Sequence, residues 1–282
     1  MKRALIFCVL LTILVPFAGC AKGNPGEITA FVGSASKPAM EEAAQAFEKE
    51  TGIKVYLNFG GSGTMLSQMK ISRSGDLYIP GSPDYMIIAE RDGVVDPETV
   101  RIISYLVPAI LVQKGNPKNI STLADLTKSG IEVGIGNPEA VCIGLYAVEV
   151  LDDNKLLEEV GNNTITYAES CSKLASLISL NSIDAVLGWR VFSYWRPDKI
   201  DVVYFSPEQV SRLAYIPAAI SKSTENRESA GKFIEFLVSL QGQRIFSKWG
   251  YIVTEDEVRK YAPDAEIGGE YKLPDSYKSL VK

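Results

Sequence analysis

Hydrophobic and polar residues follow two periods along this chain, which predicts strands and helices in alternation. Apolar or alternating runs of five or six residues predict strands, and apolar positions spaced as on one face of a helix predict helices. The first series is strand 28–32, helix 38–49, strand 54–59, helix 64–72, strand 76–79, a helix from about 82 to 92, and the apolar run 102–113.

A second series follows the turn at residues 114–117. It consists of helix 122–128, strand 131–135, helices 142–151 and 154–160, strand 164–166, helix 171–180, strand 184–188, helix 189–194 and strand 201–205. A further strand at 213–220 and helices at about 225–240 and 241–249 come next. From residue 255 the chain is polar and shows little periodicity, so no element is predicted there.

The alternation of strands and helices predicts an α/β fold, because parallel strands need helical connections that cover the sheet. Two such series predict two lobes, with crossings near residues 107–109 and 211–213. The expected organisation is lobe 1 from 28–108 and 212–254, lobe 2 from 109–211, and a C-terminal tail from 255–282.

The first 27 residues read as a targeting segment. Lys2 and Arg3 precede an apolar run that ends near residue 17, too short to cross a bilayer and typical of a signal peptide. The sequence Ala-Gly-Cys ending at Cys20 resembles a lipoprotein processing site. We expect a signal peptide at 1–19, lipidation of Cys20 and a tether at 20–27. The alternative is an ordinary signal peptide with a chance cysteine.

Composition narrows the function further. The chain has 46% hydrophobic and 22% charged residues and a net charge of −5, which is ordinary for a globular protein and argues against a nucleic-acid partner. It has no histidine, which removes the usual general base and the commonest metal ligand. We therefore expect neither an enzyme nor a cofactor.

Two cysteines remain after processing at Cys20. Cys142 and Cys171 form an even pair in an extracytoplasmic protein, where disulfides persist. A disulfide and two free thiols are both open.

Five strand-to-helix junctions are rich in glycine, serine and free backbone N–H groups. They are 33–36, 60–63, 137–144, 169–172 and 188–190. Ligands of open α/β sheets bind beyond the carboxyl ends of strands, where helix N-termini favour anions. The junctions therefore predict a small anion held by neutral donors, although serines there can also serve only as helix caps. Trp189 can be a packing residue instead of a ligand contact, and Arg190 can form a surface or hinge ion pair instead of binding the ligand.

Several stretches, in the same order, resemble the periplasmic molybdate-binding (ModA-type) receptors of ABC transporters, here in lipoprotein form. They are residues 28–40, 59–66, 75–79, 136–147 and 184–192, and the resemblance runs from about 28 to 251. It implies a type II periplasmic binding protein fold, with two α/β lobes joined by two crossovers. It also implies a monomer that hands an anion to a membrane permease.

The resemblance also implies a set of ligand contacts. The family's two serines fall at Ser34, in preference to Ser36, and at Ser62; its backbone donors fall at Ile143 and Cys171. Its tyrosine has no clear counterpart, because Gly188 or Trp189 falls there. A disulfide between Cys142 and Cys171 would lock that half of the cleft.

A related branch of the family adds two carboxylates to its ligand. Those positions fall at about Val141 and Gly188, neither of which is acidic, so the implied ligand is a four-oxygen anion held only by hydrogen bonds. The expected function is a receptor for molybdate or tungstate. The alternatives are a receptor for another small anion such as sulfate, an extracytoplasmic oxyanion sensor, and an enzyme, which the lack of histidine and of an activated nucleophile disfavours.

Overall fold

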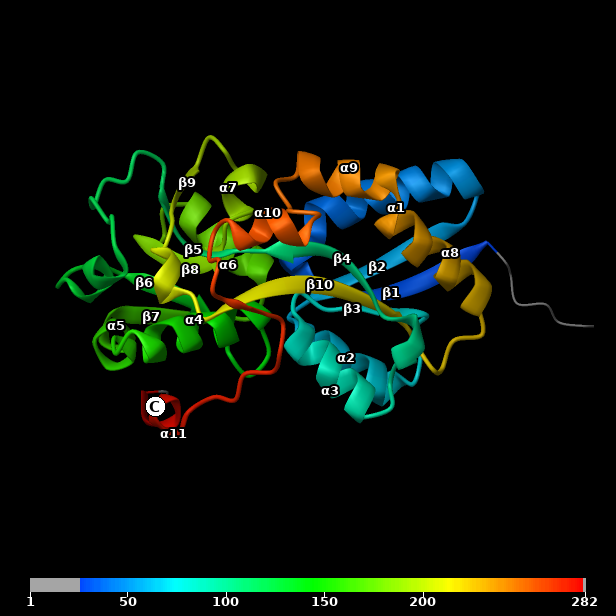
Figure 1. Cartoon of the computed structure of the whole chain (residues 1–282), viewed down its shortest axis with the longest axis horizontal. Coiled ribbons are helices and arrows are strands. Elements are labelled where there is room, and N and C mark those ends of the chain that lie inside the picture. Colours follow the sequence, from blue (N-terminus) through cyan, green and yellow to red (C-terminus); the bar gives the residue numbers. More distant parts are fainter. Residues whose placement is uncertain (1–25, 281–282) are drawn as a thin grey trace, which may run out of the picture.

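The computed structural model describes residues 26–280 and shows two lobes, each with its own sheet (Figure 1). The signal peptide and Cys20 lie outside the described residues. Among the described residues, none of the helices has the length and apolar character needed to cross a bilayer.

Lobe 1 is built on a six-stranded sheet of order β11-β10-β3-β1-β2, in which β4 also pairs with β10. Its strands are β1 (Glu27–Gly33), β2 (Lys54–Gly60), β3 (Leu77–Ile79), β4 (Arg101–Leu106), β10 (Arg212–Ile220) and β11 (Glu266–Ile267). Strand β1 is parallel to β2 and β3, whereas β10 is antiparallel to β3 and β4.

Five helices cover the two faces of this sheet. They are α1 (Lys37–Thr51), α2 (Ser62–Ser72), α3 (Pro83–Arg91), α8 (Arg227–Val238) and α9 (Leu240–Lys248). Figure 1 shows α1, α8 and α9 on one side and α2 and α3 on the other. Phe47 of α1 packs against Phe233 and Phe236 of α8, with ring centroids 5.0 and 5.5 Å apart, so these two helices share one core.

Lobe 2 contains a five-stranded sheet of order β7-β6-β8-β5-β9. Its strands are β5 (Pro108–Gln113), β6 (Val133–Gly136), β7 (Thr164–Ala168), β8 (Ala185–Trp189) and β9 (Ile200–Val203). Its helices are α4 (Cys142–Asp153), α5 (Leu157–Asn163), α6 (Cys171–Ser179) and α7 (Phe192–Trp195). Short 3-10 turns are η1 (Ser34–Ser36), η2 (Pro97–Thr99), η3 (Leu123–Thr127) and η4 (Pro207–Gln209).

The α/β architecture predicted from the alternation is confirmed, with three local differences. The apolar run 102–113 is two strands, β4 and β5, that belong to different sheets and are separated by Val107. The helix expected at 122–128 is the 3-10 turn η3. The helix expected from 189 begins only at Phe192, because Trp189 still pairs with Pro108 as the last residue of β8.

The C-terminal residues carry structure that the sequence pattern did not predict. They form α10 (Glu255–Arg259), β11 beside β10, and α11 (Asp275–Leu280), which reaches lobe 2 beneath α5 (Figure 1). The buried Tyr277 packs edge-on against Tyr167 of β7, with ring centroids 6.4 Å apart. A five-residue helix and a two-residue strand are too short to show a period.

A buried ion network joins the two lobes at Arg212. Its guanidinium donates to Glu149 of α4 in lobe 2 at 2.8 Å and lies 3.1 Å from Asp84 of α3 in lobe 1. The carbonyls of Gly268 and Gly269 accept two more of its hydrogen bonds. Burial raises the pKa of Glu149, and Arg212 opposes that rise. Removing one member of a buried network leaves an unpaired charge, which typically costs about 3–5 kcal/mol.

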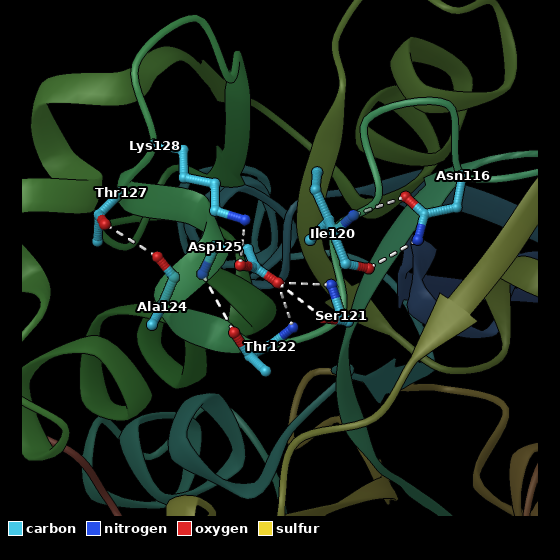
Figure 2. Close-up of polar contacts among 8 residues, drawn as sticks. All are labelled: Asn116, Ile120, Ser121, Thr122, Ala124, Asp125, Thr127 and Lys128. Atoms are coloured by element: carbon cyan, nitrogen blue, oxygen red, sulfur yellow. Dashed lines mark hydrogen bonds and ion pairs between the residues drawn. The ribbon is translucent and has the colours of Figure 1, made fainter.

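Hydrogen bonds and an ion pair stabilise the turn at η3 in lobe 2 (Figure 2). The Asp125 carboxylate accepts from the amides of Ser121 and Thr122 at 2.7 and 2.9 Å and pairs with Lys128 at 2.6 Å. The Asp125 amide in turn donates to the Thr122 hydroxyl at 3.3 Å, which completes a capping box. The Lys128 ammonium and these donors hold the pKa of Asp125 well below its usual range.

Replacing Asp125 should make the free energy of unfolding less dependent on pH in the acidic range. A carboxyl group with a lowered folded pKa stabilises above its unfolded pKa of about 4, and that stabilisation is lost as the pH falls through the folded value. We expect Asp125→Ala to lower the free energy of unfolding by about 1–2 kcal/mol near neutral pH, with the difference shrinking in acid. Urea unfolding at several pH values measures this. Asp198→Ala, at an exposed site of the same lobe, is the control, and a pH-independent difference would contradict the assignment.

Candidate functional site

The strand-to-helix junctions of the two lobes face one another. Ser34 follows β1 in lobe 1 and is 2% exposed. Its hydroxyl oxygen accepts a hydrogen bond from the amide of Ser172, in the first turn of α6 in lobe 2, at 3.2 Å. The hydroxyl hydrogen of Ser34 therefore remains available as a donor at the boundary between the lobes.

Ser62 opens α2 in lobe 1 and is 1% exposed. Its hydroxyl oxygen accepts from the Gly81 amide at 3.0 Å, so its hydrogen can also be donated elsewhere. Tyr78 donates to the Ser62 carbonyl at 2.8 Å, and Tyr251 donates to the Ala35 carbonyl at 2.6 Å. These two tyrosines hold the serine junctions in place, and sequence reasoning missed them because they lie 16 and 216 residues from their partners.

Two helices of lobe 2 begin at the same boundary. Cys142 and Ile143 are the first residues of α4, and Cys171 is the first residue of α6; each is 1% exposed. Amides in the first turn of a helix have no acceptor within that helix, and the helix dipole favours negative charge there. The backbone donors predicted at Ile143 and Cys171 therefore point out of helix N-termini at the boundary.

The two cysteines are free thiols with their sulfur atoms 3.9 Å apart. The disulfide that the sequence left open is therefore not formed in this structure, since a bonded pair would be about 2 Å apart. The Cys142 thiol also reaches lobe 1, because a methyl group on Gly81 would lie 2.6 Å from its sulfur.

Polar groups of both lobes influence the pKa of the Cys142 thiol. Burial by itself would raise the pKa of Cys142, but the Cys171 thiol and the Trp189 indole counter it. The Ser62 hydroxyl and the Ile143 amide act in the same direction, and the net effect is a lowered pKa. The groups predicted to bind an anion therefore favour negative charge at this point.

Trp189 has an unpartnered side-chain donor at the end of β8, where the sequence offered two candidate contacts. Its side chain is fully buried and packs edge-on against Tyr146, with ring centroids 5.1 Å apart. Its indole N–H has no hydrogen-bond partner of normal geometry among the described residues. At Gly188, by contrast, the space for a side chain is filled by Leu111 and Phe192. The geometry thus favours Trp189 as the donor at the end of β8.

No side-chain cation takes part in these contacts. Arg190, the charged residue of the fifth junction, donates instead to the Gly250 carbonyl and to the Tyr194 hydroxyl, the latter at 3.0 Å. Arg190 is buried and bonds to neutral oxygens, so the surface or hinge ion pair considered for it is not what the structure shows. Across residues 26–280, no three His, Cys, Asp or Glu side chains are grouped to hold a metal ion. The donors are hydroxyl, amide and indole groups.

The two lobes meet through backbone at their glycine-rich junctions. The Gly63 amide donates to the Ala140 carbonyl at 2.9 Å, and Tyr85 donates to the Pro138 carbonyl at 3.3 Å. A methyl group on Gly61 would lie 2.7 Å from the Ala140 oxygen and 2.8 Å from the Glu169 oxygen. The structure therefore describes a closed arrangement of the lobes that tolerates no side chain at Gly61.

A cavity of about 350 Å³ opens at one edge of this boundary. It lies between α1 and α9 of lobe 1 and α6 and α7 of lobe 2, and its walls include Lys37, Ser172, Trp195 and Trp249. Ser172 is also the residue whose amide contacts Ser34, so the cavity adjoins the buried donors.

Comparison with known proteins agrees with a two-lobed binding protein. A family model described as bacterial extracellular solute-binding protein matches residues 28–252. The molybdate-binding protein ModA of Escherichia coli (strain K12) is 26% identical over 242 residues, which are 84% of this chain and 93% of that protein. YvgL of Bacillus subtilis (strain 168), named as a candidate ABC transporter substrate-binding lipoprotein, is 23% identical over 259 residues, covering 89% and 98% of the two chains.

A solved structure confirms the fold. The sulfate-binding protein SubI from Mycobacterium tuberculosis H37Rv superposes with a TM-score of 0.74 at 17% identity, covering 86% of this chain and 94% of that chain. The likeness confirms the two-lobed binding-protein fold and, at this identity, carries no information on the ligand.

Substituting Gly61 should hold the lobes apart. Gly61 has φ −63° and ψ 144°, which any residue adopts, and the three atoms nearest to the methyl group of Gly61→Ala all belong to lobe 2. We expect a larger radius of gyration by small-angle X-ray scattering, with little change in the melting temperature of lobe 1.

Gly231→Ala in α8 is the matched control, because its methyl group would meet only Ile220 at 3.9 Å. That variant should keep the wild-type radius of gyration. An unchanged radius for Gly61→Ala would show that the lobes in solution do not approach as closely as described.

Proposed function

The chain belongs to the bacterial extracellular solute-binding proteins, and on that premise we propose that it captures molybdate or tungstate between its lobes and delivers it to the permease of an ABC transporter. The family consists of binding proteins, which agrees with the expectation that the chain is not an enzyme. The bound oxyanion is itself the cargo, and the proposal includes no cofactor.

One observation carries this proposal: buried neutral donors of both lobes lie at the boundary where the lobes meet. Ser34 and Ser62 contribute hydroxyl groups from lobe 1, and lobe 2 contributes helix N-termini and the Trp189 indole N–H. Hydrogen bonds to a charged group contribute about 1.5–3 kcal/mol each, so a few of them can offset the desolvation of a dianion.

Capture follows from the division of the donors between the lobes. An anion that contacts both sets of donors binds better when the lobes are closed, and therefore shifts the population toward the closed state. The contacts of Gly63 with Ala140 and of Ser34 with Ser172 form only in that state. Release to a permease then requires the lobes to separate again.

The chemistry of the donors supports selection among tetrahedral anions. Phosphate near neutral pH carries a proton, and a site made of donors has no acceptor for that O–H group. Sulfate, which is smaller than molybdate and tungstate, is the second candidate. The Escherichia coli relative is named for molybdate, and the Mycobacterium tuberculosis structure is named for sulfate.

The proposed location is the outer face of the membrane, with Cys20 as the lipid anchor and the chain acting as a monomer. The Bacillus subtilis relative named as a candidate lipoprotein supports this. A tether would keep the receptor close to its permease, and more than one acyl chain is needed for stable anchoring.

Calorimetry with four anions tests the ligand. We expect molybdate or tungstate to bind with a dissociation constant below about 1 μM, which corresponds to about 8 kcal/mol, with no measurable binding of sulfate or phosphate. Sulfate binding as tight as molybdate binding would reassign the receptor to sulfate. Binding of none of the four would overturn the oxyanion proposal.

The two serines test the site. Ser34→Ala and Ser62→Ala should each weaken oxyanion binding by about 1–3 kcal/mol, because a buried anion loses a charge-assisted donor. Ser74→Ala, at an exposed position of the same lobe, should bind like the wild type. If neither serine variant differs from this control, the anion binds elsewhere.

A further inference from the structure

Cys142 and Cys171 are placed as a reactive pair within the candidate site. Each opens a helix of lobe 2, each is 1% exposed, and their sulfur atoms are 3.9 Å apart. Helix N-termini stabilise thiolates, the form of cysteine that reacts with oxidants. Because both helices belong to one lobe, the two sulfurs stay near each other whether the lobes are open or closed.

The Cys142 thiol lies where the donors of the site converge. It lies against Gly81 of lobe 1, where a methyl group would come within 2.6 Å of the sulfur. The Gly81 amide donates to the Ser62 hydroxyl at 3.0 Å, so the sulfur lies beside the Ser62 donor. An oxyanion that used the same donors would have to displace this side chain.

Formation of a disulfide would move that sulfur. A bonded sulfur pair is about 2.05 Å apart, so the Cys142 sulfur would be drawn toward Cys171 of its own lobe. The Ser62 hydroxyl of lobe 1 would then lose the thiol as its neighbour. Unpartnered buried donors cost free energy, which an incoming oxyanion would recover.

We propose that Cys142 and Cys171 form a redox switch on anion capture: the reduced Cys142 thiol occupies the anion site, and the Cys142–Cys171 disulfide vacates it. The switch rests on the proposed function, because it acts on the same donors. In this structure both thiols are reduced, and the thiol contacts both lobes in the closed arrangement.

The oxidation balances with a peroxide as the oxidant. The Cys142 thiolate attacks one peroxide oxygen, the O–O bond breaks, and a sulfenic acid and water form after proton uptake. The Cys171 sulfur then attacks the Cys142 sulfur, the S–O bond breaks, and the Cys171 proton leaves with the hydroxide as a second water. The two thiols lose two electrons, which reduce the peroxide. Gly81 and Ser62 cover Cys142 from lobe 1, so the reaction takes place when the lobes are open.

The experiment compares oxidised and reduced forms of the purified protein. Hydrogen peroxide and a phosphine reductant prepare the two forms, and intact mass and thiol titration establish the loss of two hydrogens and two thiols. Molybdate titration should then show that the oxidised form binds about tenfold more tightly or better, since a tenfold change corresponds to about 1.4 kcal/mol. Failure to form the disulfide, or binding by the reduced form as tight as by the oxidised form, overturns the switch.

Three variants test whether the redox effect depends on Cys142 and Cys171. Cys142→Ala should bind equally after either treatment, at the tight level of the oxidised protein, because no thiol occupies the site. Cys171→Ala should not gain tight binding after peroxide, because its Cys142 sulfur can reach the sulfenic acid but cannot form the disulfide. The double variant controls for peroxide damage elsewhere, and a peroxide response that persists in it overturns the switch. Circular dichroism verifies folding, and Cys142→Ser replaces Cys142→Ala if the latter does not fold.

The same titrations separate the switch from the receptor. Molybdate binding that is equal in both redox forms removes the switch and leaves the receptor intact. Absence of binding to molybdate, tungstate, sulfate and phosphate in every form, including the double variant, overturns the receptor and the switch together.

Discussion

The close approach of the two lobes at their glycine-rich junctions is the constraint on which the rest of the structure depends. Neutral donors are weak ligands in water, because water competes for every hydrogen bond, and become strong only where water is excluded. Backbone contacts such as that between Gly63 and Ala140 bring the lobes close enough for this, and Gly61 could not carry a side chain there. The proposed site is therefore complete only when the lobes are closed.

The molecule joins its lobes in two different chemical ways. At Arg212 the link is ionic, buried and extensive, since one guanidinium contacts Glu149 of lobe 2 and Asp84 of lobe 1. At the site the link is made of single neutral hydrogen bonds, such as that between Ser34 and Ser172. Separating buried charges is costly, whereas neutral donors that open to water are solvated at once. The ionic link thus suits a persistent connection, and the neutral one suits a boundary that opens and closes.

The position of Cys142 connects the architecture of the site to its chemistry. Cys142 opens α4, where the helix dipole favours negative charge, and nearby polar groups lower the pKa of its thiol. The thiol therefore lies at a position where the surrounding dipoles favour negative charge. An acidic chain with no buried cation at this point can favour negative charge there because oriented dipoles suffice.

The sequence by itself determined the alternation of strands and helices, and with it the two-lobed α/β fold, because these depend on local periodicity. It also marked the strand-to-helix junctions at Ser34 and Ser62, because glycine and serine have local conformational and hydrogen-bonding roles. Only the tertiary structure decided which groups meet. It favoured Trp189 over Gly188 as a donor and showed that Arg190 bonds to Tyr194. It also placed Cys142 beside Cys171 and revealed the roles of Tyr78, Tyr251 and the C-terminal elements. Each of these depends on contacts between residues distant in the chain, and a periodic pattern carries no record of such contacts.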